Sequence, residues 1–214
     1  MGEGNARFDP DCRQCGRLAG FLDEVRERHP GYHCRPVEPF GAARHRLLVV
    51  GLAPGLHGAN RTGRPFTGDH AGLLLYRTLH AHGFASQPTS VAADDGQRLA
   101  DCRITNAVKC LPPANKPLPA EVRQCNRYLA AELLAVPPGG VIVALGAIAH
   151  GAVLRALGLK AGQARFAYAA EHDLPRRLRL IDSYHCSRYN TQTRRLTAAM
   201  FDRIFARARH LLAD

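Results

Sequence analysis

The chain has 214 residues, of which 46% are hydrophobic and 22% are charged, as is ordinary for a folded globular protein. This length is enough for one domain with a sizeable core, so we expect a single domain over residues 1–214. Lysine and arginine number 29 against 18 acidic residues, and the net charge of +11 either favours a polyanionic partner such as nucleic acid or reflects a generally arginine-rich proteome.

The beginning of the chain, Met1-Gly2-Glu3-Gly4-Asn5, has neither the basic nor the apolar segment of a secretory signal peptide. No apolar run further along is long enough to cross a bilayer. We therefore expect a cytoplasmic monomer with no membrane partner. Structural disulfides are rare in the cytoplasm, so the seven cysteines are predicted to be metal ligands or buried thiols.

Short apolar runs alternate with helical patterns along the chain. The runs are rich in Val, Ile and Leu, and they predict four buried parallel strands at 47–52, 103–108, 141–145 and 178–183. Helices are predicted at 71–82, 119–134, 147–157 and 196–212. This order predicts an α/β fold, a three-layer α/β/α sandwich with a central four-stranded parallel sheet. Residues 87–99 are expected to form a loop or short excursion, and 161–177 a hairpin or surface loop.

A glycine-rich stretch, GLAPGLHGANRTGRPFTGDHAG, joins the first strand to the first helix between Gly51 and Gly72. Glycines let backbone N–H groups approach a ligand, and a helix N-terminus favours an anion. In parallel sheets, ligands bind beyond the carboxyl ends of the strands. Asn106, Gly146 and the segment 184–190 also follow strand ends. We therefore expect these residues and the glycine-rich stretch to converge on one edge of the sheet.

Four of the cysteines have the spacing of a metal site. Cys12 and Cys15 form a C-x-x-C pair whose thiolates can face one metal centre, and Cys110 and Cys125 form C-x14-C. Four thiolates can hold an iron–sulfur cluster or a zinc ion. Alternatively, Cys12 and Cys15 are a redox or zinc pair and the other two are core thiols. From the residues alone, zinc is slightly favoured.

The other three cysteines, Cys34, Cys102 and Cys186, are predicted to be small buried hydrophobes. Cys186 adjoins His185, which raises the idea of a thiol nucleophile with a histidine base. Adjacent residues in an extended segment point in opposite directions, so this pair is poorly placed for that chemistry.

Three features together resemble the iron–sulfur uracil-DNA glycosylases, most closely the family 5 (type B) branch. They are the run NRTGRPFTGD, the spaced cysteines, and the segment SYHCSRYN after the fourth strand. The resemblance covers residues 12 to about 193. It implies a structural 4Fe-4S cluster held by Cys12, Cys15, Cys110 and Cys125. It also implies a monofunctional DNA glycosylase that flips out uracil, hypoxanthine or ethenocytosine from DNA and leaves an abasic site for base excision repair.

The resemblance assigns three residues to the flipped base. Phe66 stacks on it, Asn106 recognises its edge with an amide, and His185 donates a hydrogen bond to a base carbonyl. Each has a plainer alternative. In the alternative, Asn106 would be a turn or cap residue, and His185 would be an ordinary loop histidine among eleven in the chain. Phe66 is a core residue, although its glycine and polar neighbours argue against that.

The first motif departs from other branches, which place a carboxylate or amide there to position the attacking water. Here it consists of Gly51, Leu52, Ala53, Pro54 and Gly55. Asp69 is then the candidate to position the water or to stabilise the developing sugar cation, and it is equally a good helix N-cap. Asn60 and Asn115 are further polar candidates, and Asn115 is placed to reach the base or a phosphate.

The resemblance also implies a DNA-contacting loop that wedges into the duplex and binds phosphates. Its residues are Ser187, Arg188, Tyr189, Asn190 and Thr191. No lysine stands in the motifs where a Schiff base would form, so water is the expected nucleophile and no lyase step is expected.

Two other hypotheses remain open. One is a protein that captures uracil-DNA covalently on a histidine, with His57 and His70 as candidates. The other is an iron–sulfur protein that binds damaged DNA without catalysis. A DNA adduct that survives denaturation would identify the first, and binding without abasic-site formation the second.

Overall fold

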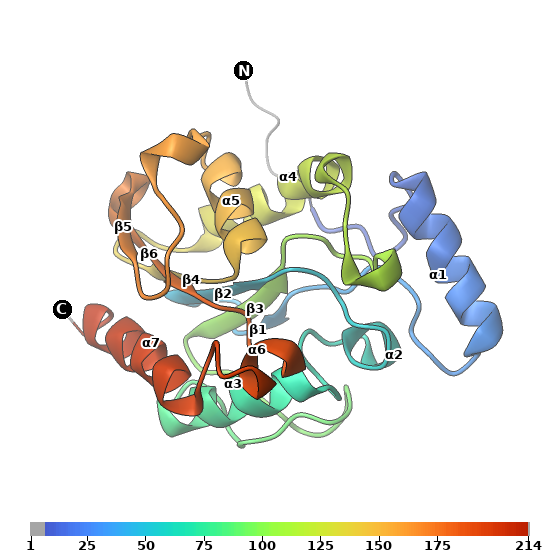
Figure 1. Ribbon diagram of the computed structural model, residues 1–214, viewed down its shortest axis with the longest axis horizontal. Coiled ribbons are helices and arrows are strands. Elements are labelled where there is room, and N and C mark those ends of the chain that lie inside the picture. Colours follow the sequence, from blue (N-terminus) through green and yellow to red (C-terminus); the bar gives the residue numbers. More distant parts are fainter. Residues whose placement is uncertain (1–6, 214) are drawn as a thin grey trace.

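The computed structural model describes residues 7–213 (Figure 1). The prediction that no signal peptide is present rests on Met1 to Asn5 and lies outside the described residues. Within them, no helix is both long and apolar enough to cross a membrane.

A six-stranded sheet in the order β1-β3-β2-β4-β6-β5 forms the centre of the molecule. The four central strands pair in parallel, which confirms the predicted four-stranded parallel sheet; they are β2 (Leu47–Gly51), β3 (Cys102–Asn106), β4 (Val141–Leu145) and β6 (Leu178–Ser183). The antiparallel edge strands β1 (Phe40–Gly41) and β5 (Glu171–Leu174) were missed. They are short, and β5 is mostly polar, so neither gives an apolar signal. The hairpin considered for 161–177 is realised in part by β5, which pairs with β6.

Two layers of helices cover the sheet, as predicted (Figure 1). The helices α4 (Pro119–Ala135) and α5 (Ala147–Ala156) lie on one face, and α3 (His70–Ala81) and α7 (Ala198–Leu211) on the other. Their ends differ from the predicted ones by no more than two residues. The layers meet at alternating strand residues, because successive side chains point to opposite faces: Val49 faces α3 and α7, and Val50 faces α4 and α5.

Three further helices lie near the carboxyl ends of the strands or beside the cysteines. They are α1 (Gly16–Arg28), α2 (Ala59–Thr62) and α6 (Arg188–Gln192), and none was predicted. Short 3-10 turns occupy Pro113–Asn115, Ala161–Gln163 and Pro175–Arg177. The helix α1 buries Leu18, Leu22 and Val25, whose helical spacing was a signal available in the sequence.

Candidate active site

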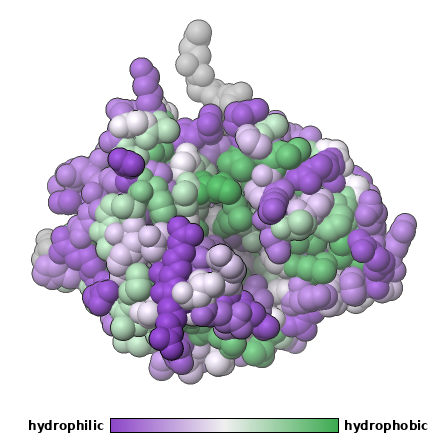
Figure 2. Space-filling view, viewed as in Figure 1, coloured by the Kyte–Doolittle hydropathy of each residue, from purple (hydrophilic) through white to green (hydrophobic). Residues whose placement is uncertain are grey.

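A cavity of about 410 Å³ opens where β2, β3 and β6 end. Figure 2 shows a hollow near the middle of this face, with apolar residues on its walls and hydrophilic residues around it. Eleven residues singled out from the sequence line the cavity: Leu52, Ala53, Gly55, Phe66, Asp69, His70, Asn106, Asn115, His185, Ser187 and Arg188. Gly51 and Pro54 are buried and do not line it.

Gly51 allows two of these side chains to pack against the end of β2. A Cβ atom at this position would overlap Oδ1 of Asn106 and would lie 2.5 Å from the Phe66 ring. Gly51 is the register partner of Asn106 on β3, so the two strands bring backbone and amide side by side. The first glycine of the motif is therefore required by the closeness of the side chains around it.

Phe66 is both a core residue and a wall of the cavity, so the argument against a core position was wrong. Its exposed fraction is 5%, and it packs in the cluster between the sheet and α3. Its φ is +54°, and its ring lies near that of His185, with centroids 5.8 Å apart and planes 28° apart. The glycine neighbours noted in the sequence provide the space for this burial, since a Cβ at Gly72 would overlap the Phe66 carbonyl.

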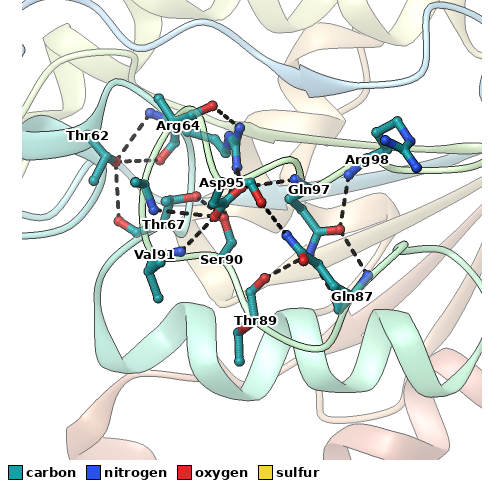
Figure 3. A network of polar contacts seen from close by, with 12 residues as sticks. Thr62, Arg64, Thr67, Gln87, Thr89, Ser90, Val91, Asp95, Gln97 and Arg98 are labelled. Atoms are coloured by element: carbon teal, nitrogen blue, oxygen red, sulfur yellow. Dashed lines mark hydrogen bonds and ion pairs between the residues drawn. The ribbon is translucent and has the colours of Figure 1, made fainter.

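A buried polar network fixes the segment that carries Phe66 (Figure 3). Arg64 pairs with Asp95 at 2.5 Å and donates to Ser90 at 3.1 Å, and the Ser90 and Thr67 hydroxyls lie 2.8 Å apart. Burial opposes ionisation of Asp95, but hydrogen bonds from Arg64 and backbone N–H groups outweigh it and hold the pKa of that carboxyl well below its usual range. The segment 87–99 is thus a brace for Phe66, a role its polar sequence did not reveal.

Asn106 lines the cavity, and its side chain carries an unsatisfied acceptor. Its exposed fraction is 3%, and its side-chain Oδ1 has no hydrogen-bond partner. A buried acceptor without a partner is costly in a folded protein, and such groups often mark ligand sites. The backbone carbonyl oxygen of Asn106 accepts a hydrogen bond from Lys109 Nζ at 2.9 Å. Lys109 is itself buried and paired with Glu132 at 2.7 Å.

Asp69 serves as the N-cap of α3 and also faces the cavity. Its Oδ1 accepts from the backbone N–H of Gly72 at 2.9 Å, which confirms the N-cap prediction. The other oxygen lies over the glycine-rich stretch, where a Cβ at Gly58 would overlap it. The geometry therefore lets one carboxylate cap the helix and still present an oxygen to a bound molecule.

His185 follows β6 and lines the cavity together with Asp69 and Asn106. Burial lowers its pKa, and the nearby charge of Asp69 opposes this change without reversing it. Near neutral pH the imidazole is thus in its neutral form, which can donate one N–H. Among the described contacts, Asn190 fixes the backbone here, because its Nδ2 donates to the His185 carbonyl at 2.8 Å.

The segment expected to be a DNA-contacting loop is instead the short helix α6, capped by Ser187. The Ser187 hydroxyl accepts from the N–H of Asn190, an S-x-x-N pattern that the loop prediction overlooked. Tyr189 is 70% exposed, and Thr191 Oγ1 lies 2.9 Å from Nε2 of His70. Arg188 and Tyr189 therefore project from a fixed element at the rim of the cavity.

The four spaced cysteines surround a second, mostly apolar cavity beside α1 and α4. Among the described residues, no three of their sulfur atoms lie within 4.8 Å of one another. A tetrahedral zinc ion with Zn–S bonds of about 2.3 Å needs sulfurs about 3.8 Å apart, which is closer than any three of these sulfurs lie to one another. Burial raises the pKa of Cys110, and it raises that of Cys125 to about 11, against the lowering effect of Lys109.

Two donors already point at these sulfurs. The Lys109 N–H lies 3.3 Å from Cys125 Sγ, and Arg127 Nη2 lies 3.9 Å from Cys12 Sγ. Both would stabilise thiolates, which are the ligand form of cysteine.

The remaining cysteines are buried, as predicted. Cys186 is fully buried, and burial raises its pKa, so the structure argues against a thiolate nucleophile there. Of the two histidines considered for covalent capture, His70 lines the cavity, whereas His57 is exposed and lies 2.9 Å from the Tyr32 hydroxyl.

Comparison with known proteins identifies the family. A family model described as the uracil DNA glycosylase superfamily matches residues 38–209, a range that includes every element around the active-site cavity. The chain belongs to the uracil DNA glycosylase superfamily. Within this superfamily it is 46% identical to a type-5 uracil-DNA glycosylase of Thermus thermophilus over 205 residues, covering 94% of this chain and 93% of that protein.

Two further members place the chain within the superfamily. It is 44% identical to a type-5 uracil-DNA glycosylase of Mycobacterium tuberculosis, over 94% of this chain and 78% of that one. A type-4 uracil-DNA glycosylase of Thermotoga maritima matches at 40% identity, but over only 49% of this chain and 46% of that protein. The resemblance to the type-5 branch of the superfamily is thus confirmed.

Proposed function

We propose that this chain is a monofunctional uracil-DNA glycosylase, which hydrolyses the bond between uracil and deoxyribose in DNA. The observation that carries this proposal is the unpartnered Oδ1 of Asn106 in the cavity of a superfamily member. Uracil offers an N3–H donor at the edge that this oxygen would meet. Cytosine has a lone pair there, and the acceptor would stay unsatisfied, which disfavours the normal base.

The side chains around Asn106 supply the other parts of the reaction. The Phe66 ring provides an apolar face for the flipped base, and His185 in its neutral form donates an N–H to a base carbonyl. That hydrogen bond strengthens as negative charge develops on the departing base. The second oxygen of Asp69 positions the attacking water or stabilises the positive charge on the sugar.

The first motif contributes only backbone and apolar side chains, because Leu52 and Ala53 carry no general base. Catalysis therefore relies on stabilising a good leaving group. We expect activity on other deaminated or alkylated bases, such as hypoxanthine and ethenocytosine, to follow from this dependence on leaving-group quality. At the rim, Arg188 contacts phosphate and Tyr189 enters the space of the flipped nucleotide.

We propose that the four cysteines hold a 4Fe-4S cluster, because all four line one cavity and two donors point at their sulfurs. Such a cluster supplies a cross-link and no step of the base excision. Its ligands would join the segment of Cys12 and Cys15 before α1 to Cys110 after β3 and Cys125 in α4. The segment that follows Asn106 at the end of β3 would thereby be fastened to the N-terminal segment.

The test is an incubation of cluster-loaded protein with labelled duplexes that contain one uracil, hypoxanthine or ethenocytosine, and a matched undamaged duplex. Strand cleavage only after alkali establishes a monofunctional glycosylase, and the rates rank the bases. Tight binding without alkali-labile sites would reject the proposal in favour of a binding protein. A denaturation-resistant adduct, lost in His70→Ala, would reject it in favour of covalent capture.

A further inference from the structure

Two histidines and one aspartate form a cluster outside the active-site cavity, where α5 meets the β5–β6 hairpin (Figure 1). His150 lies in α5, His172 on β5 and Asp182 on β6. Oδ1 of Asp182 is 2.8 Å from Nδ1 of His150, and Oδ2 is 3.0 Å from Nε2 of His172. Among residues 7–213, this is the one trio of His, Cys, Asp or Glu whose candidate ligand atoms all lie within 4.8 Å of one another.

The Asp182 carboxylate requires a positive charge beside it. Its exposed fraction is 0%, and its ion-pair partners among the described residues are the two histidines. An ionised carboxylate buried without a compensating cation is strongly destabilising. A cation bound between the three side chains would supply such a charge.

The surroundings of His150 are compatible with a bound cation. Its Nδ1 faces Asp182, and its Nε2 lies 3.1 Å from the carbonyl oxygen of Ala164. A neutral imidazole has one N–H, so it can donate to only one of these two oxygens. When Nε2–H donates to Ala164, the lone pair of Nδ1 points at the carboxylate. Histidines that bind metals typically donate their second N–H to a backbone carbonyl in this manner.

We propose that His150, His172 and Asp182 bind a divalent transition-metal cation of the zinc class. Two imidazoles and one carboxylate suit zinc, cobalt and nickel, whereas magnesium and calcium prefer oxygen ligands alone. Bonds of about 2.0–2.1 Å in a tetrahedral site place neighbouring ligand atoms about 3.3 Å apart, so the two distances between Asp182 and the histidines need to open by only a few tenths of an ångström. The His172 side chain is 16% exposed, which leaves room for a water ligand on that side.

The cation acts on the fold and not on the reacting atoms. None of the three ligands lines the active-site cavity. A bound ion would fasten α5 to both strands of the hairpin and fix the end of β6, three residues before His185. We therefore assign it the role of holding the strand from which the active-site histidine emerges.

The test is an anaerobic titration of the cluster-loaded protein with cobalt(II), followed by absorption spectroscopy, with zinc titrated in a thermal-unfolding assay. We expect one equivalent of cobalt to bind without a thiolate-to-cobalt charge-transfer band. Zinc at a hundred times its dissociation constant should raise Tm by about 5–10 °C. His172→Gln should abolish both effects, and His80→Gln, at an exposed position in α3, should keep them.

Asp182→Asn keeps the shape of the side chain and removes its charge, so it should weaken cobalt binding by about tenfold or more. The proposal is overturned if no saturable cobalt spectrum forms, if the first equivalent shows thiolate charge transfer, or if His172→Gln binds cobalt as the unaltered protein does. A zinc-induced rise in Tm that is unchanged in His172→Gln would also overturn it.

Discussion

At the scale of single residues, the candidate site depends on how closely side chains approach the backbone at Gly51. Gly51→Ala would place a methyl group against both Asn106 and Phe66, and two walls of the cavity would have to move. We expect uracil excision to fall by about 100-fold or more, because misplacement of a site by about 1 Å has effects of that size. Single-turnover kinetics on uracil duplexes measure this.

Gly20→Ala is the matched control for that substitution. Gly20 lies in α1, and a Cβ there would meet no atom within 4 Å. Alanine should leave excision unchanged and stabilise the helix by about 0.5–1 kcal/mol. Equal activity of the two variants would refute the packing argument.

Asn106 carries the second prediction at this scale. Asn106→Ala removes the unpartnered acceptor from the cavity, and we expect kcat on uracil to fall by about 100- to 1,000-fold. The fold should persist, because the lost oxygen has no partner within the described protein. Asn126→Ala is the control: that buried amide donates to the Ala152 carbonyl between α4 and α5, so its loss should lower Tm and spare kcat. An unchanged kcat in Asn106→Ala together with a lowered kcat in Asn126→Ala would rule out a role for Asn106 in base recognition.

At the scale of elements, the segment 87–99 has a structural role that its polar sequence did not predict. Its hydrogen bonds converge on Asp95, which holds Arg64 and, through it, the turn that carries Phe66 (Figure 3). Short runs rich in Val, Ile and Leu identified every central strand, although β3 and β6 also contain polar residues. Such runs could not identify this brace, whose stabilisation comes from partners about 30 residues away in the chain.

The brace makes a prediction with a definite pH dependence. Asp95→Asn should lower the free energy of unfolding by about 3 kcal/mol near pH 7, since it breaks a buried ion pair. The pKa of Asp95 is lowered in the folded protein, so its stabilisation is present above the unfolded-state pKa near 3.8 and is lost as the pH falls. Urea unfolding of both proteins from pH 7 to pH 3 measures the difference, which should shrink at the acid end. A difference that stays constant with pH would contradict this account.

Apart from α1, the elements that were missed from the sequence are short. The helix α6 spans five residues, with its N-cap serine as the main local signal, and β1 spans two. Such elements owe their conformation to packing against the rest of the fold. Asp69 illustrates the same limit, since a helix N-cap and an active-site carboxylate have the same local sequence pattern, and the cavity that Asp69 faces forms only when distant segments meet.

At the scale of the whole molecule, the proposed cluster joins the segment before α1 to the segment after β3 and to α4. Cys125→Ser should lower the iron content and the Tm together and should expose the region before α1 to limited proteolysis. Cys102→Ala alters a buried thiol that lies in the sheet and does not line the cysteine cavity, so this variant should keep the iron. Iron analysis, thermal unfolding and mass spectrometry of the fragments decide the matter. Full iron content in Cys125→Ser would exclude that residue as a ligand.

The segment after β3 connects the proposed base recognition to the proposed iron–sulfur site. Asn106 and Cys110 are four residues apart, and Lys109 between them donates from its side chain to the Asn106 carbonyl and from its backbone to Cys125. The group proposed to recognise the lesion and the sulfurs proposed to hold iron thus belong to one small rigid unit. Oxidants that attack the sulfurs should therefore impair lesion recognition before the remaining fold is lost. In a cell under oxidative stress, the repair capacity of this protein would decline as the demand for repair increases.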